Sequence, residues 1–321
     1  MLTNKFESLE KLIGNTPLIK IRVSYKDRKI DVFAKLEWFN LTGSIKDRAA
    51  LLMLKKAYLD GSFTSNHTVV EVTSGNMGIS LATICASLGV KVNIIMPNHV
   101  SMERKAIIKM LGAEVIEQSS FDECFLKCDS YNNTQKYCRT YQFDNILNVK
   151  ANNKTGDEIL EKLPAVEMFV SGVGTGGTLM GVAEMLIKKS TTRTKIVAVD
   201  PEESSLLTLG RSKGKHSIQG LSDSKIPSLY KREMVDEIIA ISDEDAIEMA
   251  KKLNKTGLPV GISGGANFWV VIKSAIKNNI SKVVTIFPDD NKKYVSTDLS
   301  KPITQPADFI KEIEILDWEV I

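Results

Sequence analysis

Short, unbroken runs of valine and isoleucine recur along this chain, and segments with helical periodicity separate them. Residues 68–72, 91–96, 195–199 and 282–287 are examples. Strands that lack polar alternation are buried on both faces, and parallel strands need helical crossovers to connect them. The pattern therefore predicts an α/β fold. We expect two three-layer lobes with mostly parallel sheets, and an active site between them at the carboxyl ends of the strands.

The remaining elements follow the same alternation. We expect further strands at 31–36, 114–117, 167–170 and 237–241. We expect helices from Lys46 to near Gly61 and at 77–88, 101–111, 120–139, 177–189, 243–255 and 266–278. Residues 213–217 and the tail from Thr297 carry no periodic pattern, so we expect them to be irregular.

The composition is that of an ordinary globular protein. The 321 residues are 43% hydrophobic and 25% charged, and the formal net charge is +3. Such a small and evenly spread charge argues against nucleic acid or a membrane surface as a partner. No apolar run has the length of a signal peptide or a membrane span, so we expect a cytoplasmic protein.

Cysteine and histidine are both scarce. Cys124 and Cys128 are the only close pair among four cysteines, and they lie one turn apart in an expected helix. Two small buried residues explain this pair better than half of a metal site does. Because the chain has only three histidines, we expect no metal site.

Lys46 lies in a stretch, Asn40 to Arg48, that places an amine where a helix disfavours one. Thr42 or Ser44 can cap the helix start, and apolar residues then recur at helical spacing, so Lys46 falls in the first turn. The helix macrodipole and the nearby core both favour loss of its proton. A neutral amine can attack an aldehyde, which makes Lys46 a Schiff-base candidate. The alternative is a lysine whose stem covers the core while its amine reaches solvent.

Two glycine-containing segments stand where a strand gives way to a helix. In residues 71–78, backbone N–H groups and the hydroxyls of Thr73 and Ser74 form a pocket suited to a carboxylate. In residues 171–178, glycines let main-chain amides approach a phosphate. The first segment alone is weak evidence, because many strand-to-helix corners have this composition.

The second segment also matches a dinucleotide-binding fingerprint. Gly172, Gly174 and Gly177 have the required spacing, and Asp200 ends the next expected strand, where a ribose-binding acid could lie. A nicotinamide-dependent oxidoreductase is therefore a rival interpretation. Against it, Asp200 lies further along than is usual, and this interpretation gives Lys46 no role.

Residues 261–265 imitate the nucleophile elbow of a serine hydrolase. A hydrolase of that type needs a histidine after its serine. None of the three histidines follows Ser263, so we set this interpretation aside.

A Schiff-base lysine, a carboxylate loop and a phosphate cradle together indicate pyridoxal phosphate and an amino-acid substrate. The sequence resembles the cysteine synthase (O-acetylserine sulfhydrylase) family. That family and the cystathionine β-synthase core are fold-type II, tryptophan synthase β-like enzymes. Five motifs carry the resemblance, in the family's order and spacing: residues 13–18, 40–48, 73–78, 174–178 and 261–266.

The resemblance implies a division of the chain and an assembly. Residues 38–148 form an N-terminal lobe with the cofactor lysine and the carboxylate loop. Residues 1–37 and 149–321 form a C-terminal lobe with the phosphate loop. The family is typically dimeric, so we expect a homodimer.

The resemblance also implies a role for each site residue. Lys46 binds the cofactor and moves the Cα proton, and Asn76 hydrogen-bonds the cofactor's 3′-oxygen. The phosphate loop consists of Gly174, Thr175, Gly176, Gly177 and Thr178. The substrate carboxylate binds to Thr73, Ser74, Met77 and Gln142.

Three positions depart from the family pattern. Met77 replaces a usual threonine, and Gly264 replaces the serine that hydrogen-bonds the pyridine nitrogen; neutral drift is an even alternative for both. We expect Ser263 to lie on that nitrogen's side of the cofactor. Asp223 stands among residues that are usually small and uncharged. A carboxylate there needs a partner or a function, so we assign Asp223 to catalysis and substrate binding, as acid and then base.

The implied chemistry is β-replacement through an aminoacrylate, which makes or breaks a Cβ–S bond of a serine- or cysteine-type amino acid. The departures favour L-cysteine as the substrate and release of hydrogen sulfide, with water or a thiol as the nucleophile. Ordinary synthesis of cysteine from O-acetylserine and sulfide is the alternative. A binding protein without turnover and the oxidoreductase are more remote.

Overall fold

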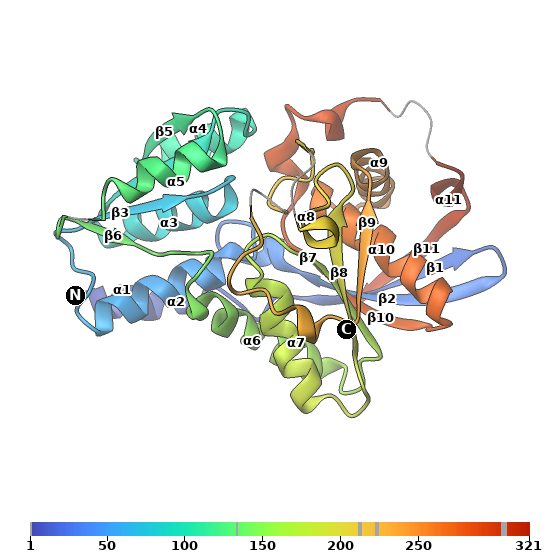
Figure 1. The fold of residues 1–321 in the computed structure, drawn as a ribbon. Helices are drawn as coiled ribbons and strands as arrows, with labels where there is room; N and C mark the ends of the chain where they lie inside the picture. Colours follow the sequence, from blue (N-terminus) through green and yellow to red (C-terminus); the bar gives the residue numbers. More distant parts are fainter. Residues whose placement is uncertain (1, 133, 211–213, 222–224, 303–306) are drawn as a thin grey trace.

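The computed structural model describes residues 2–132, 134–210, 214–221, 225–302 and 307–321. Its strands form two separate sheets, of seven and four strands. The two sheets lie side by side with helices around each of them, and the expected α/β class is confirmed (Figure 1).

The larger sheet has the order β11-β1-β2-β10-β7-β8-β9. Strands β2, β10, β7, β8 and β9 run parallel, whereas β1 is antiparallel to both of its neighbours. The bounds are β1 (Leu18–Tyr25), β2 (Arg28–Leu36), β7 (Met168–Gly172), β8 (Lys195–Pro201), β9 (Glu237–Ile241), β10 (Lys282–Phe287) and β11 (Ile313–Val320).

Helices cover both faces of this sheet. α9 (Asp243–Asn254) and α10 (Ile262–Asn278) pack on one face, and α6 (Ile146–Lys162) and α7 (Gly177–Lys189) on the other (Figure 1). Alternate residues of one strand therefore enter different cores: Met168 and Val170 face the first pair of helices, and Phe169 faces the second. This burial on both faces explains the unbroken apolar runs in the sequence.

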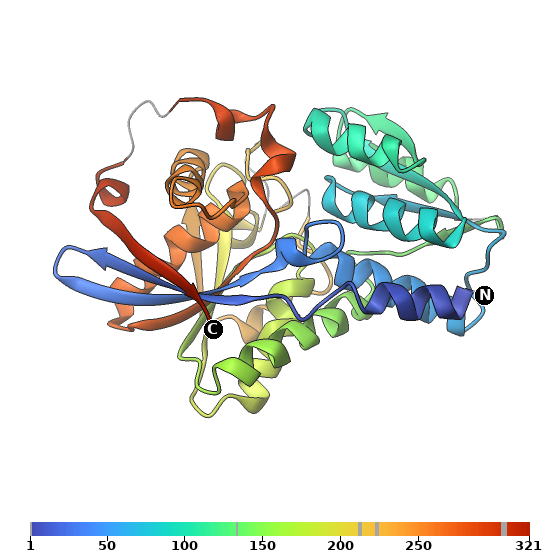
Figure 2. The ribbon, with the colours of Figure 1, turned by 180° about the vertical axis from the view of Figure 1, so that it is seen from behind.

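The smaller sheet has the order β5-β4-β3-β6, and all of its strands are parallel. One face packs against α1, α2, α3 and α4, and the other packs against α5 (Figure 2). The strands are β3 (Thr68–Val72), β4 (Lys91–Pro97), β5 (Glu114–Gln118) and β6 (Tyr137–Arg139). The helices are α1 (Leu2–Glu10), α2 (Lys46–Leu59), α3 (Asn76–Leu88), α4 (Met102–Met110) and α5 (Phe121–Asp129).

Six short helices complete the described elements. They are η1 (Glu37–Phe39), α8 (Leu206–Leu209), η2 (Arg232–Met234), η3 (Asn291–Tyr294), η4 (Asp298–Ser300) and α11 (Asp308–Lys311).

Three sequence expectations about secondary structure are wrong. The helix expected at 120–139 ends at Asp129, and residues 137–139 form β6 instead. The tail from Thr297 is not irregular throughout, because β11 pairs with β1. The helix expected from 266 begins at Ile262, because the small residues there allow close packing. A Cβ on Gly265 would lie 2.4 Å from the Ala246 carbonyl oxygen of α9.

The first 37 residues serve both sheets. β1 and β2 belong to the larger sheet, while Phe6 and Leu9 of α1 pack in the core beside the smaller sheet. The lobe boundaries given above stay a prediction.

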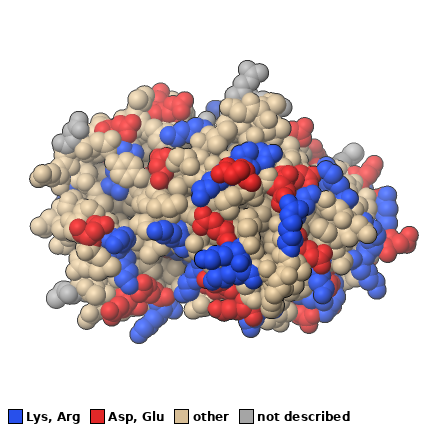
Figure 3. All heavy atoms as spheres, turned by 60° about the horizontal axis from the view of Figure 1, so that its bottom comes forward, with Lys and Arg blue, Asp and Glu red and all other residues tan. Residues whose placement is uncertain are grey.

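The surface carries both charge signs. Acidic and basic side chains are interspersed on the face that Figure 3 shows. Among the described residues, every helix is too short or too polar to cross a bilayer. Cys124 and Cys128 are buried and unpaired, as expected.

Candidate active site

A narrow cavity lies where the two sheets meet, beside the carboxyl ends of β3, β7 and β10. The cavity has two parts, one near residues 73–77 and one near residues 174–178. Lys46 borders both parts. The expected site residues that line the cavity are Lys46, Thr73, Ser74, Asn76, Met77, Gln142, Gly174, Thr175, Gly176, Thr178 and Ser263. The fold therefore brings together segments that are far apart in the sequence.

Lys46 is the first residue of α2. The Ser44 hydroxyl accepts a hydrogen bond from the Lys46 backbone N–H at 3.3 Å, as a helix-start residue should. The Thr42 N–H donates to the Asp47 carboxylate at 2.7 Å. These contacts fix the first turn of the helix and with it the root of the Lys46 side chain.

A buried ion network holds α2 just after Lys46. Arg48 pairs with Glu37 at 2.7 Å and with Glu158 at 2.8 Å, and Lys35 also pairs with Glu158. All four side chains are buried. Burial alone would raise the pKa of Glu158, but Arg48 and Lys35 lower it to about 2. The network ties α2 to β2 and α6, so Lys46 stands on a rigid element.

The loop at residues 73–76 has a shape that glycine makes possible. Gly75 has a φ of +143°, and a Cβ there would lie 2.2 Å from Cδ of buried Arg104. The Thr73 hydroxyl accepts a hydrogen bond from the Gly75 N–H at 3.0 Å. α3 begins at Asn76, so this loop presents the N-terminus of a helix to the cavity, which suits a carboxylate.

Gln142 closes the far side of this loop. Its side-chain amide donates to the Val72 carbonyl, and its backbone N–H donates to Glu71 at 3.1 Å. Burial raises the pKa of Glu71, although hydrogen bonds from Thr140 and the backbone oppose that rise. Residues 71–77 and Gln142 thus form one connected unit.

The segment 174–178 forms the second half of the cavity. A Cβ on Gly174 would lie 2.0 Å from the Gly220 carbonyl oxygen, and one on Gly177 would lie 2.1 Å from Oδ1 of Asn148. Gly176 has a φ of +83°, and α7 begins at the next residue. Close backbone approach and a helix N-terminus together suit a phosphate group.

Four residues of the site were not singled out from the sequence. Asn148 donates to the Thr175 hydroxyl at 2.9 Å, and Asn267 accepts from the Gly172 N–H at 2.8 Å. Asp289 accepts from the Asn76 amide at 2.7 Å. Gln219 lines both parts of the cavity. Asparagine and aspartate are common in loops and caps, so none of these residues had a distinctive sequence signal.

Ser263 and Gly264 point in different directions. Ser263 lines the cavity near Lys46. A Cβ on Gly264 would instead lie 2.2 Å from a methyl group of Val260. Residue 264 therefore faces the protein interior, and the serine beside it faces the site.

Asp200 has a different role from the one that a dinucleotide site requires. Its carboxylate accepts the backbone N–H groups of Leu207 and Thr208 and the Thr208 hydroxyl, at 3.0–3.1 Å. It therefore caps the short helix α8 and holds the chain beyond β8. Asp223, the remaining candidate, lies outside the described residues.

Comparison with known proteins decides the family. The family described as "Pyridoxal-phosphate dependent enzyme" matches residues 9–289. The chain belongs to this family. Cysteine synthase B of Campylobacter jejuni is 42% identical over 299 residues, which span 91% of this chain and 98% of that protein.

Solved structures agree. A hydrogen sulfide-producing enzyme from Fusobacterium nucleatum superposes with a TM-score of 0.91 at 38% identity, covering 99% of this chain and 100% of that one. A mutant of that enzyme, complexed with an alpha-aminoacrylate intermediate, gives a TM-score of 0.93. Cysteine synthase from Entamoeba histolytica gives 0.85 at 36% identity, covering 95% of this chain and 93% of that one. This chain is therefore a pyridoxal-phosphate enzyme of the cysteine synthase family, and its chemistry is β-replacement.

The residues present fit that cofactor. Lys46 supplies an amine, and the backbone of residues 174–178 is suited to a phosphate. Ser263 lines the same part of the cavity and offers a hydroxyl to the cofactor. The side-chain oxygen of Asn76 is buried and makes no hydrogen bond to the described residues, so the Asn76 amide has capacity left for a ligand.

Proposed function

We propose that this enzyme consumes L-cysteine and releases hydrogen sulfide, with water or a thiol as the incoming nucleophile. The observation that carries the proposal is the match, over 99% of this chain, to an enzyme described as hydrogen sulfide-producing. Ordinary cysteine synthesis is the second candidate, because the Campylobacter relative at 42% identity is a cysteine synthase.

Within this proposal, Lys46 holds the cofactor and moves the substrate's Cα proton. Bound pyridoxal phosphate draws electron density away from Cα, which lets the Cβ substituent leave. Asn76 bonds the 3′-oxygen, the backbone and hydroxyls of 174–178 hold the phosphate, and Ser263 faces the pyridine nitrogen. The buried ion network beside Lys46 fixes the first turn of α2, and with it the backbone from which the Lys46 side chain extends.

The substrate carboxylate is held by the loop that contains Thr73 and Ser74, together with Gln142. Backbone N–H groups at the start of α3 supply hydrogen bonds and a favourable dipole. Met77 is buried and supplies an apolar contact in place of a hydroxyl. The loop therefore orients the amino acid while leaving Cβ accessible to the nucleophile.

Asp223 is our candidate for the proton transfers at sulfur. Leu221, two positions earlier in the sequence, lines the cavity. A protonated carboxyl could donate to the departing sulfur, and the resulting carboxylate could then activate water or a thiol. Cysteine needs such help because a thiolate leaves less readily than acetate does.

We also propose a homodimer. Hydrogen bonds from Lys293 to Gly43 and from Ser101 to Lys293 bring three surface segments together, 39–43, 101–103 and 293–296. Phe39, Met102 and Val295 on these segments are 59%, 74% and 63% exposed. Exposed apolar side chains on neighbouring segments suit contact with a second copy of the chain. Light scattering on the holoenzyme, with Val295→Glu as the variant, tests the assembly.

A product assay distinguishes the two candidate reactions. The holoenzyme is incubated with cysteine, O-acetylserine or serine, each with and without sulfide or an added thiol, and products are identified by mass spectrometry. The proposal expects hydrogen sulfide from cysteine as the faster reaction. Faster turnover of O-acetylserine with sulfide, and little sulfide from cysteine, would favour cysteine synthase instead.

A further inference from the structure

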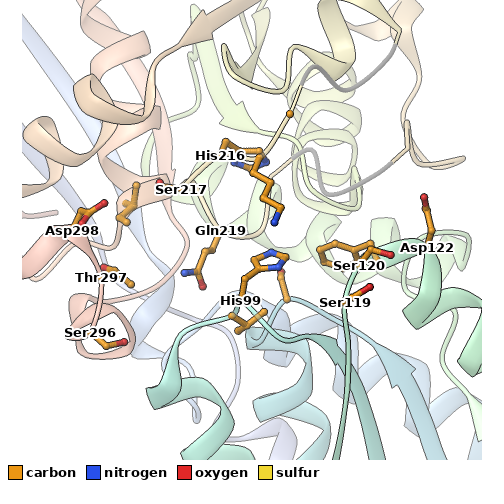
Figure 4. Close-up of a pocket in the computed structure, with 16 residues that line it drawn as sticks. His99, Ser119, Ser120, Asp122, His216, Ser217, Gln219, Ser296, Thr297 and Asp298 are labelled. Carbon is orange, nitrogen blue, oxygen red and sulfur yellow. The ribbon is translucent and has the colours of Figure 1, made fainter.

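A second, larger cavity opens outside the narrow one. Its volume is about 530 Å³, and Ser74 and Gln219 line it as well as the inner cavity. His99 follows β4 of the smaller sheet, whereas His216 and Gln219 belong to the chain between α8 and β9 of the larger one. Figure 4 shows His99 and His216 approaching this space from the two sides, with Gln219 beside them. Anything that reaches the inner cavity by this route passes between both lobes.

The size of this outer cavity exceeds what water or sulfide requires. A water molecule occupies about 30 Å³ in the liquid. A volume of about 530 Å³ can hold an organic molecule with several non-hydrogen atoms. The volume is therefore suited to a co-substrate with a carbon skeleton.

Three basic residues, His99, Lys215 and His216, line the outer cavity. Burial lowers the pKa of His99, and the positive charges of Lys215, Lys105 and His216 lower it further. That effect requires these groups to lie close to one another. Within the described part of the chain, Lys215 makes no ion pair. His216 is different, because it lies near the Asp243 carboxylate. Lys215 is therefore a cation of this lining whose charge is not neutralised by a described carboxylate.

Carboxylates lie at the edges of the cavity. Asp122 and Asp298 appear at opposite sides of it in Figure 4. Asp298 forms an ion pair with Lys301 at 2.5 Å, so its negative charge is already paired. The hydroxyl of Ser120 caps α5. The wall around Lys215 and His99 is thus the part of the cavity best suited to an anion.

We propose that the outer cavity is the subsite of the incoming nucleophile, and that Lys215 selects thiols that carry a carboxylate. The inference rests on the proposed β-replacement at Lys46 and specifies its second substrate. The carboxylate meets Lys215 and His99, and the sulfur points past Ser74 and Gln219 toward the substrate's Cβ. In the exchange, the thiol's S–H bond and the Cβ–X bond break and a Cβ–S bond forms. The leaving group X departs with the proton as HX, and no oxidant or reductant is needed.

Two thiols that differ in one group test this directly. The holoenzyme is given O-acetylserine with either 3-mercaptopropionate or 2-mercaptoethanol, and kcat/KM for each thiol is measured. We expect 3-mercaptopropionate to be preferred about fivefold, the scale of one solvent-accessible ion pair. The preference should shrink at high salt, because exposed charges are screened.

Variants assign the preference to one side chain. Lys215→Met should remove most of the preference and Lys215→Glu should reverse it, while turnover with 2-mercaptoethanol stays within about twofold of wild type. Lys188→Met, an exposed lysine on α7, is the matched control and should change neither thiol. A wild-type ratio near one, or a Lys215 variant that slows both thiols equally, would overturn the inference.

The two proposals can fail separately. Release of acetate from O-acetylserine, or of sulfide from cysteine, is measured without any thiol. If neither leaving group is released, the proposed function itself is wrong. If release is normal but kcat/KM is no higher for 3-mercaptopropionate than for 2-mercaptoethanol, only the assignment of the outer cavity is wrong.

Discussion

The Asn76 amide donates a hydrogen bond of 2.7 Å to the Asp289 carboxylate, joining the start of α3 to the chain just beyond β10. Asp289 is fully buried and also accepts from the Tyr294 hydroxyl and from Arg104. One carboxylate thus orients a proposed cofactor contact from the smaller sheet and balances a buried guanidinium. We therefore expect cofactor binding to depend on how the two sheets are aligned.

Asp289→Asn tests this coupling. The variant removes the charge that faces Arg104 and weakens the acceptor that orients Asn76. We expect a loss of about 3–5 kcal/mol in unfolding free energy, because a buried charge loses its partner. We also expect weaker retention of pyridoxal phosphate on dialysis. Asp308→Asn, at an exposed helix start, is the control, with a change within about 0.5 kcal/mol. If Asp289→Asn retains the cofactor as well as wild type does, Asp289 does not act on cofactor binding through Asn76.

Lys46 should carry the cofactor. The purified enzyme is expected to be yellow, and borohydride reduction should fix a pyridoxyl group on the peptide that contains Lys46, as read by mass spectrometry. Lys46→Ala should lose at least about 10²–10⁴-fold in turnover, the range of one positioned acid–base group. Lys188→Ala should keep both colour and activity. A pyridoxyl group on any other lysine would contradict the assignment.

Asp223→Asn should affect one substrate more than another. We expect hydrogen sulfide release from cysteine to slow by about 10²–10⁴-fold, since a proton donor and acceptor is lost. Release of acetate from O-acetylserine should change little, because acetate leaves without protonation. Both rates are measured on the cofactor-loaded variant. Equal effects on the two substrates, or no effect, would make Asp223 a structural or solvent-facing residue.

Arg48→Met probes the ion network next to Lys46. Removing the guanidinium leaves two buried carboxylates without their main partner, which should cost about 3–5 kcal/mol in unfolding free energy. Urea denaturation measures the loss. Arg193 forms an ion pair but its side chain is 85% exposed, so Arg193→Met should cost less than about 1 kcal/mol. Similar losses for the two variants would mean that the network does not stabilise α2.

Glu158 makes the same network sensitive to acid. Its folded pKa, about 2, lies below the ordinary 4.5, so its ionised form stabilises the fold above pH 4.5. This contribution is lost as the pH falls from about 4.5 to about 2. The difference in urea stability between wild type and Glu158→Gln should therefore be largest near neutral pH and shrink below pH 4.5. Glu161→Gln, exposed on the same helix, should show no such trend. A pH-independent gap would contradict the argument.

The sequence was most informative where chemistry constrains a short segment. A lysine at a helix start and glycines at strand ends are costly unless they have a function, so Lys46 and residues 174–178 could be selected as candidates without a structure. Their neighbours could not. Asn148 and Asp289 matter because of what they touch, and each touches a residue distant in the chain.

The elements that the sequence did not predict have poor local signals. The helix α6 contains four asparagine, threonine or glycine residues in Asn152–Gly156, which lower helix propensity. Gly156 is nevertheless required there, because a Cβ would lie 2.8 Å from Met185 of α7. Tertiary packing, which the local pattern does not encode, decides this helix.

Strand β11 closes the edge of the larger sheet by pairing with β1, almost 300 residues earlier in the chain. Its sequence, Ile-Glu-Ile-Leu-Asp-Trp-Glu-Val, intersperses acidic residues, and Arg22 of β1 pairs with two of them, Asp317 and Glu319. Until β11 has been synthesised, the backbone donors and acceptors along the outer side of β1 have no partner strand. A chain that still lacks β11 therefore exposes one edge of this sheet, and that edge is where it would add strands from neighbouring chains.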